Sequence, residues 1–261
     1  MCDSSHAHSP PTKQINNTMK KTMQLIKIVG VAALAATMNV NAGQPAVDAT
    51  SSTPLVSLET GFSSEEVWRG ASLGRDEANA VLSVETQLPA DITLALGADY
   101  SAADSDVKDE QTDLSAVFSK SVSDYLVSLS YIWYSQDVAV GGGQAQEAGV
   151  SVSRSIGPVD VSLTQYLGLV GDNNSYSELA ATYSDDFGSS IVFDFRSELG
   201  YLAQEGQCTH FETRVSTDIP VTAEIVAVPF VAYSLGLDDS VGVHSDMSNL
   251  FFGGIEFKRS F

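Results

Sequence analysis

Residues 125–134 read Tyr-Leu-Val-Ser-Leu-Ser-Tyr-Ile-Trp-Tyr, and the alternation within this stretch decides the fold of the chain. Apolar or aromatic side chains occupy every second position from Tyr125 to Trp133, while serines occupy two of the positions between them. Residues 92–100, Ile-Thr-Leu-Ala-Leu-Gly-Ala-Asp-Tyr, show the same pattern. Because successive side chains of a β-strand point to opposite faces, both stretches predict strands with one apolar face and one face of small, polar or charged side chains.

The alternation returns roughly every 15 to 20 residues, and no stretch after Ala42 has convincing helical spacing. The sequence therefore predicts an all-β protein of about twelve strands. We expect these strands near residues 55–63, 79–88, 92–101, 112–122, 125–136, 146–156, 159–169, 175–184, 190–201, 209–217, 222–235 and 249–261.

The predicted connections alternate between tight turns and mostly longer loops rich in Gly, Asp, Asn and Ser. The tight ones are 89–91, 123–124, 157–158, 185–189 and 218–221, and the others are 64–78, 102–111, 137–145, 170–174, 202–208 and 236–248. An even strand number with short turns on one side and longer loops on the other is typical of an antiparallel transmembrane β-barrel, with the short turns in the periplasm.

A soluble β-sandwich also alternates and also turns often, but three features favour the barrel. Charges lie on the polar face of many strands, where a lumen accommodates them. The chain ends on Phe261, in one alternating row with Ile255 and Phe257; such an ending resembles the signal that the barrel-assembly machinery reads, although Arg259 replaces the usual hydrophobic residue. Aromatic residues gather near strand ends, like the girdles of a membrane interface: Tyr100, Tyr125, Trp133, Tyr183, Tyr201, Phe211, Tyr233 and Phe257.

The N-terminal part has the composition of an export signal. From Met19, two lysines precede an apolar run between Leu25 and Met38 and a small-residue cleavage site that ends at Ala42. We interpret residues 1–18 as a mis-annotated upstream extension, 19–42 as a signal peptide, 43–54 as a flexible periplasmic lead-in and 55–261 as the barrel. The expected location is the outer membrane of a Gram-negative envelope, in contact with its lipid and lipopolysaccharide.

The charge of the chain excludes some partners. The formal net charge is −20, and residues beyond Ala42 comprise nine basic against 32 acidic side chains. Such a surface repels phosphate, so nucleic acid is not an expected partner. With Cys2 ahead of the cleavage site, Cys208 stands alone in a polar loop and no disulfide is expected.

The segment 59–74, Glu-Thr-Gly-Phe-Ser-Ser-Glu-Glu-Val-Trp-Arg-Gly-Ala-Ser-Leu-Gly, resembles the opening of the bacterial Gcw-chp family of conserved hypothetical proteins. The resemblance lies in an aromatic-Arg-Gly-x-Ser turn, here Trp68, Arg69, Gly70 and Ser72, and covers about the first sixty residues of the mature chain. The acidic pair Glu65-Glu66 departs from the family pattern. The resemblance implies a secreted outer-membrane barrel with these four residues at its rim, and it implies no particular role.

Motifs that carry chemistry are largely missing. The sequence contains no nucleophile elbow, no paired CxxC, no zinc-protease motif and no phosphate-binding glycine loop, so we expect no cofactor. His210 and His244 are the histidines beyond Ala42, and they keep an outer-membrane lipid hydrolase open as an alternative. Asp104, Asp106, Asp109 and Glu110 lack the spacing of a calcium loop, so we interpret them as a solvated acidic loop and expect no metal site.

The polar rows of the predicted strands would line the lumen, because an Arg or Lys on the lipid face costs about 2 to 4 kcal/mol near the midplane. This excess of acids favours a narrow, porin-like channel that prefers cations and passes small solutes, and the alternative is a charge-paired plugged interior in a structural or adhesin barrel. The predicted lining residues are Glu59, Glu85, Asp99, Asp113, Glu147, Glu178, Asp194, Arg196, Glu198, Glu212, Arg214, Glu224, Glu256 and Lys258, with Arg69 at the rim.

Overall fold

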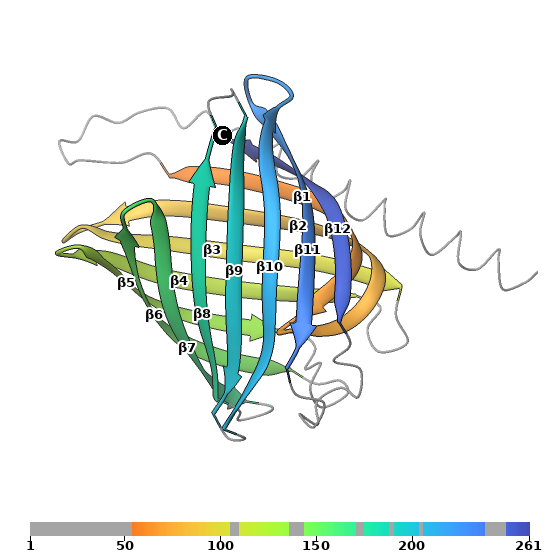
Figure 1. Ribbon diagram of the computed structural model, residues 1–261. Helices are drawn as coiled ribbons and strands as arrows, with labels where there is room; N and C mark the ends of the chain where they lie inside the picture. The colour runs from red at the N-terminus through yellow and green to blue at the C-terminus, as the bar shows by residue number, and fades with distance from the viewer. Residues whose placement is uncertain are drawn as a thin grey trace, which may run out of the picture. The chain divides into compact units, whose positions relative to one another are not determined.

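The computed structural model describes residues 54–104, 110–135, 144–170, 175–187, 191–203, 206–237 and 249–261. Twelve strands form one closed barrel in which each strand pairs antiparallel with its neighbours along the chain (Figure 1). The strands are β1 Leu55–Trp68, β2 Ala71–Leu88, β3 Ile92–Asp104, β4 Gln111–Val122, β5 Tyr125–Tyr134, β6 Ala145–Ile156, β7 Val159–Val170, β8 Ser175–Asp185, β9 Val192–Leu202, β10 Gln207–Pro220, β11 Ile225–Gly236 and β12 Leu250–Ser260. The expected all-β barrel of about twelve strands is confirmed.

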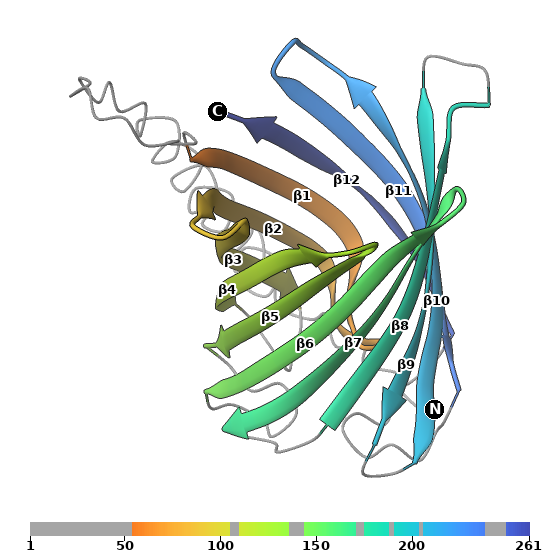
Figure 2. The ribbon, with the colours of Figure 1, turned by 90° about the vertical axis from the view of Figure 1, so that its left-hand side faces the viewer.

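The barrel closes between its first and last strands. β1 pairs with β12 from Ser57 opposite Ser260 to Ser63 opposite Gly254, and the backbone N–H of Phe261 donates to the carbonyl oxygen of Val56 at 2.8 Å. Every strand therefore has two partners, which removes the exposed edges that a sandwich would leave. β1 begins and β12 ends at the same end of the barrel, which we call the termini end (Figure 2). The opposite end is the loop end.

The outer face of the barrel is apolar. Paired residues point to the same side of the sheet, so the register carries each face from strand to strand. Leu129 pairs with Val150, and both side chains are exposed on the outside of the wall. Leu114, Phe118 and Leu163 are likewise large, apolar and exposed. A belt of this kind fits a hydrocarbon environment, as the alternation predicted.

The connections follow the expected asymmetry with two exceptions. At the termini end the connections 89–91, 123–124, 157–158 and 221–224 are short, while 135–144 and 237–249 at the loop end are the longest. The connection 186–191 is longer than the other turns at its end. The second exception is larger: residues 64–78, predicted as a long loop, extend β1 to Trp68 and start β2 at Ala71, with a two-residue turn between them.

The reason for this error is physical. Residues 64–78 are rich in polar side chains and carry no regular alternation, because the tip of this hairpin turns into the barrel interior, where it contacts Glu147 and Tyr176. Register shifts at Glu66/Val67 and between Arg75 and Ala78 break its period further. The predicted upstream extension, signal peptide and cleavage at Ala42 lie outside the described residues. No helix in the described part of the chain is long and apolar enough to cross a membrane.

Candidate functional site: the barrel interior

The predicted lining residues share the inner face of the wall, with one exception. One row runs Glu59, Val81, Asp99, Asp113 across β1 to β4, and Glu59 also pairs with Lys258 on β12. On the far wall, Glu198 pairs with Glu212, Arg196 with Arg214 and Asp194 with Ser216. Glu85, Glu147, Glu178 and Glu256 stand on the same face by their spacing along β2, β6, β8 and β12. Ten of the predicted acids therefore point inward.

Glu224 is the exception. The sequence placed it in a strand from 222 to 235, but β11 begins at Ile225 and Glu224 lies in the preceding turn. Its carboxylate pairs at 2.6 Å with Arg259, which lies on the outer face of β12 and stacks on the Phe261 ring at 4.5 Å. The Thr222 hydroxyl accepts hydrogen bonds from the backbone N–H groups of Glu224 and Ile225, so both donors have a partner within the turn. Glu224 therefore belongs to a turn at the termini end and not to the lumen.

The residues predicted as an assembly signal end the barrel wall. Ile255 and Phe257 pair with Pro229 and Ala227 on β11 and lie on the outer face, and Phe261 keeps the strand register through its backbone. The structure shows where these side chains lie, and their role in assembly stays a prediction.

The tip of the β1–β2 hairpin reaches across the lumen. Arg69 and Gly70 both have positive φ, 50° and 82°, as a tight two-residue hairpin turn requires. The Arg69 guanidinium contacts both carboxylate oxygens of Glu147 on β6, at 2.9 and 2.7 Å, and the Tyr134 hydroxyl donates to the same carboxylate at 2.9 Å. Because β3, β4 and β5 lie between β2 and β6 in the closed wall, this contact crosses the interior.

Aromatic rings surround the same guanidinium. Its central carbon lies 4.4 Å from the ring of Trp68, 4.2 Å from that of Tyr176 and 5.4 Å from that of Tyr166. The side chains of Arg69 and Glu147 are 17% and 9% exposed, so both charges are largely withdrawn from water. Charge-assisted hydrogen bonds in such surroundings are stronger than at a surface. The contacts tie the hairpin tip to β5, β6, β7 and β8.

His210 on β10 packs against the hairpin tip beside the same aromatic cluster. A Cβ added to Gly70 would lie 2.4 Å from the His210 Cβ, and one added to Gly200 on β9 would lie 2.5 Å from the His210 ring. The imidazole is fully buried between these glycines and stacks parallel to Tyr176, with ring centroids 6.4 Å apart. Gly70 thus has two reasons to lack a side chain: its backbone conformation and this close approach.

Both ring nitrogens of His210 are engaged. Nδ1 lies 3.0 Å from the Thr209 hydroxyl and Nε2 lies 3.3 Å from Glu198. Because Thr209 and His210 are almost completely buried, a lipid substrate has no approach to them. The arrangement is that of a packing group, and His244 lies outside the described residues. The described geometry therefore offers no support for the lipid-hydrolase alternative.

The inward-facing cations are matched by carboxylates. Arg196 contacts Glu178 at 2.9 Å and Glu198 at 3.0 Å, and Arg214 contacts Glu256 at 2.5 Å. Lys258 lies 3.5 Å from Glu256 and 3.7 Å from Glu59. Arg196 and Lys258 are nearly half exposed, so their pairs are partly screened by water, whereas Arg214 and Glu256 are more buried and hold each other more firmly.

The interior toward the termini end carries small hydroxyl side chains instead. Ser57 and Ser83 are 2.6 Å apart, Ser119 and Ser128 2.8 Å, and Thr164 donates to Ser151 at 3.0 Å. These pairs lie between neighbouring strands and point inward by their register. The bulky aromatic contacts occur around the hairpin tip, whereas this end is lined by side chains that leave room for water.

Three tyrosines around the hairpin tip were not predicted from the sequence: Tyr134, Tyr166 and Tyr176. Each stands on the small or polar row of its strand, where an aromatic ring is out of pattern, and that position was the available signal. The motif Trp68-Arg69-Gly70-x-Ser72, expected at the rim, forms the hairpin tip, and Ser72 donates a hydrogen bond to Glu65 across the hairpin. Cys208, predicted in a loop, is the second residue of β10 and pairs with Tyr201 on β9; it is a free, exposed cysteine.

Together the closed twelve-stranded wall, the apolar outer belt and the charged interior define a β-barrel of the outer-membrane class. No protein-family model matches the sequence, and no curated protein matches it. Solved structures do resemble it. A chain from work on the mechanism of in-meso crystallization of membrane proteins has 10% identity and a TM-score of 0.51, covering 79% of this chain and 84% of that one.

Two porins show a similar likeness. The KdgM porin has 9% identity and a TM-score of 0.49, covering 78% of this chain and 99% of its own. The NanC porin has 12% identity and a TM-score of 0.47, covering 79% and 98%. At such identities these likenesses concern the barrel fold and say nothing of a solute.

Proposed function

We propose that the protein is a narrow outer-membrane channel that favours small cationic solutes and is constricted by the β1–β2 hairpin. The observation that carries this proposal is the inner face: ten acidic side chains from the wall face a lumen that holds Arg69, Arg196, Arg214 and Lys258. An excess of carboxylates in a narrow, low-dielectric tube makes its potential negative and concentrates cations.

In this proposal the termini end lies in the periplasm and forms a wide, hydroxyl-lined entrance. The constriction around Trp68, Arg69 and Tyr176 then lies toward the cell exterior. The barrel-assembly machinery reads the terminal strand through Ile255, Phe257 and Phe261, and the outer belt contacts lipid and lipopolysaccharide.

The second candidate is a non-conducting structural or adhesin barrel. The contact of Arg69 with Glu147 favours it, because this contact and its aromatic neighbours occupy the middle of the interior at the loop end. The two candidates share one fold and differ in whether water and ions pass the hairpin.

Planar-bilayer recording of the purified barrel decides between them. We expect discrete conductance steps and, in a salt gradient, a reversal potential of the sign that cation permeation gives. The preference should weaken between 0.1 M and 1 M salt, since the screening length falls from about 10 Å to about 3 Å. A barrel that inserts without conducting supports the structural candidate, and anion preference contradicts the proposal.

A further inference from the structure

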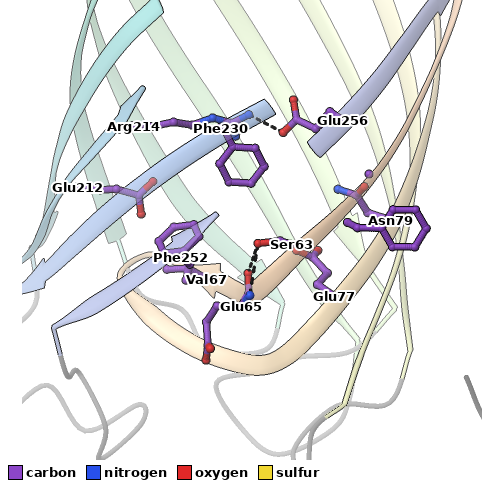
Figure 3. Close-up of a pocket in the computed structure, with 12 residues that line it drawn as sticks. Ser63, Glu65, Val67, Glu77, Asn79, Glu212, Arg214, Phe230, Phe252 and Glu256 are labelled. Atoms are coloured by element: carbon purple, nitrogen blue, oxygen red, sulfur yellow. Dashed lines mark hydrogen bonds and ion pairs between the residues drawn. The ribbon is translucent and has the colours of Figure 1, made fainter. Parts of the chain in front are cut away.

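A cavity lies on the flank of the hairpin that faces β10, β11 and β12. Its volume is about 170 Å³, enough for a small organic molecule, and it lies between Val67 on the hairpin and the wall residues Glu212, Phe230 and Phe252 (Figure 3). The hairpin tip contacts β6, β7 and β8 on its other flank. The cavity thus occupies space that the docked hairpin leaves along the interior wall.

The charge around this cavity is negative. Glu65, Glu77, Glu212 and Glu256 line it together with a single cation, Arg214. That cation is already neutralised, because Glu256 holds it at 2.5 Å and its guanidinium stacks on the Phe230 ring at 3.8 Å. Figure 3 shows the Arg214–Glu256 pair at one side of the cavity and the Glu212 carboxylate at another.

Glu212 differs from the other carboxylates there. Within the described residues its carboxylate makes no hydrogen bond and no ion pair, whereas Glu65 accepts from Ser72 and Glu256 holds Arg214. A carboxylate on a largely buried wall, without a cation of its own, favours a positively charged guest.

An apolar surface faces this carboxylate. Phe230 and Phe252 are 9% and 8% exposed, pack edge to face with centroids 6.4 Å apart, and contact Val67. Aromatic rings attract cations as well as apolar groups. The combination of a free carboxylate with a buried aromatic surface therefore suits a cation that also carries an apolar group.

Asn79 lies on the cavity wall on the side away from Glu212 (Figure 3). Its side-chain oxygen has no hydrogen-bond partner among the described residues and lies 2.6 Å from where a Cβ on Gly61 would lie. Because this oxygen is almost completely covered, a guest held at Glu212 does not contact it, and the site rests on Glu212 and the two phenylalanines. No group of three His, Cys, Asp or Glu side chains in the described ranges is arranged to hold a metal ion.

We propose that this cavity binds a small organic ammonium ion, with the charged group at Glu212 and its apolar group on Phe252. The inference rests on the proposed channel and names the class of solute that would pause beside the constriction. Anionic solutes are excluded from the same place, because the carboxylates around the cavity repel them.

Benzylammonium is a suitable probe, titrated by calorimetry into the full barrel in detergent at low salt. Glu212→Gln should weaken its binding about tenfold or more, because a hydrogen-bonded charge contact is lost while the shape stays. Phe252→Leu should weaken it by a smaller factor. The matched control is Glu224→Gln, a glutamate in the turn before β11 and outside the lumen, which should leave binding unchanged.

Benzyl alcohol, which has the ring without the charge, should bind at least tenfold more weakly than benzylammonium. Heat-modifiable gel mobility confirms that each variant is folded. Absence of benzylammonium binding to the wild-type barrel overturns the inference, as does equal weakening by Glu224→Gln. Conductance is measured separately: a barrel that conducts without binding the probe refutes this site alone, and a barrel that binds without conducting refutes the channel.

Discussion

Replacing Arg69 by Ala should release the hairpin and raise the conductance of the barrel. The substitution removes two contacts to Glu147, at 2.9 and 2.7 Å, and three ring contacts within 5.4 Å. Hydrogen bonds to charged groups contribute about 1.5 to 3 kcal/mol, and a cation over a ring about 0.5 to 2 kcal/mol. Among the described residues, it also leaves Glu147 buried with Tyr134 as its one remaining side-chain donor.

The backbone strain of the turn does not change in this variant, because alanine at the φ of 50° is strained by about 1 to 2 kcal/mol just as arginine is. A net loss of about 3 kcal/mol lowers the ratio of docked to undocked hairpin by more than about a hundredfold. If the docked hairpin narrows the pore, the mean single-channel conductance rises. The cation preference rises with it, since a positive charge leaves the narrowest region.

The matched control is Arg75→Ala. Arg75 belongs to the same hairpin, but its side chain is 84% exposed and its nearest atom lies 3.9 Å from the Glu65 carboxylate. Exposed pairs of this kind contribute about 0 to 1 kcal/mol, so conductance should change little. An unchanged conductance in the Arg69 variant, or an equal rise in the Arg75 variant, would refute the assignment of the hairpin tip as the constriction.

Three further predictions rest on the same geometry. Gly70→Ala should displace the hairpin from His210 and raise conductance. Gly157 has a comparable φ of 61° but open space around it, so Gly157→Ala should add backbone strain and leave conductance unchanged. Deleting Phe261 should lower the yield of heat-modifiable barrel more than Phe251→Ala, whose side chain lies exposed on the outer face; equal yields would count against the terminal residue as an assembly signal. Neutralising Glu85, Asp99 and Asp194 together should move the reversal potential toward zero. Glu224→Gln, in the turn before β11, should leave the reversal potential unchanged. An equal shift in the Glu224 variant would mean that the inner face has been assigned wrongly.

The strands were predictable because the membrane imposes the alternation. Along rows such as Leu94, Leu96 and Ala98, one face must be apolar to meet lipid, and the other can be small or charged. Residues 64–78 escape this constraint, since the hairpin meets protein and lumen on both faces. Their polar composition therefore indicated a loop, and composition alone cannot distinguish a loop from a strand that folds into a barrel.

The pairing of charges inside the lumen could not be predicted from the sequence, for a different reason. Arg69 and Glu147 are 78 residues apart, and Arg214 and Glu256 are 42 apart, so each pair depends on the closure of the barrel and the register of every strand between. A shift of one residue in a single register would turn the following side chains to the other face. The sequence could assign faces, but it could not choose partners.

The sign of the interior charge is nevertheless insensitive to which partners form. Each of the four inward cations has one or two carboxylates, and Glu256 serves two cations at once. Pairing therefore consumes few more acids than there are cations, and carboxylates such as Glu212, which meets no described cation, remain over. Because charges of either sign are costly on the lipid side, nearly all of this surplus must face water in the lumen or the loops. Part of the acidic excess therefore faces the lumen in the register observed, whichever partners the cations choose, and this is the physical basis of the proposed preference for cations.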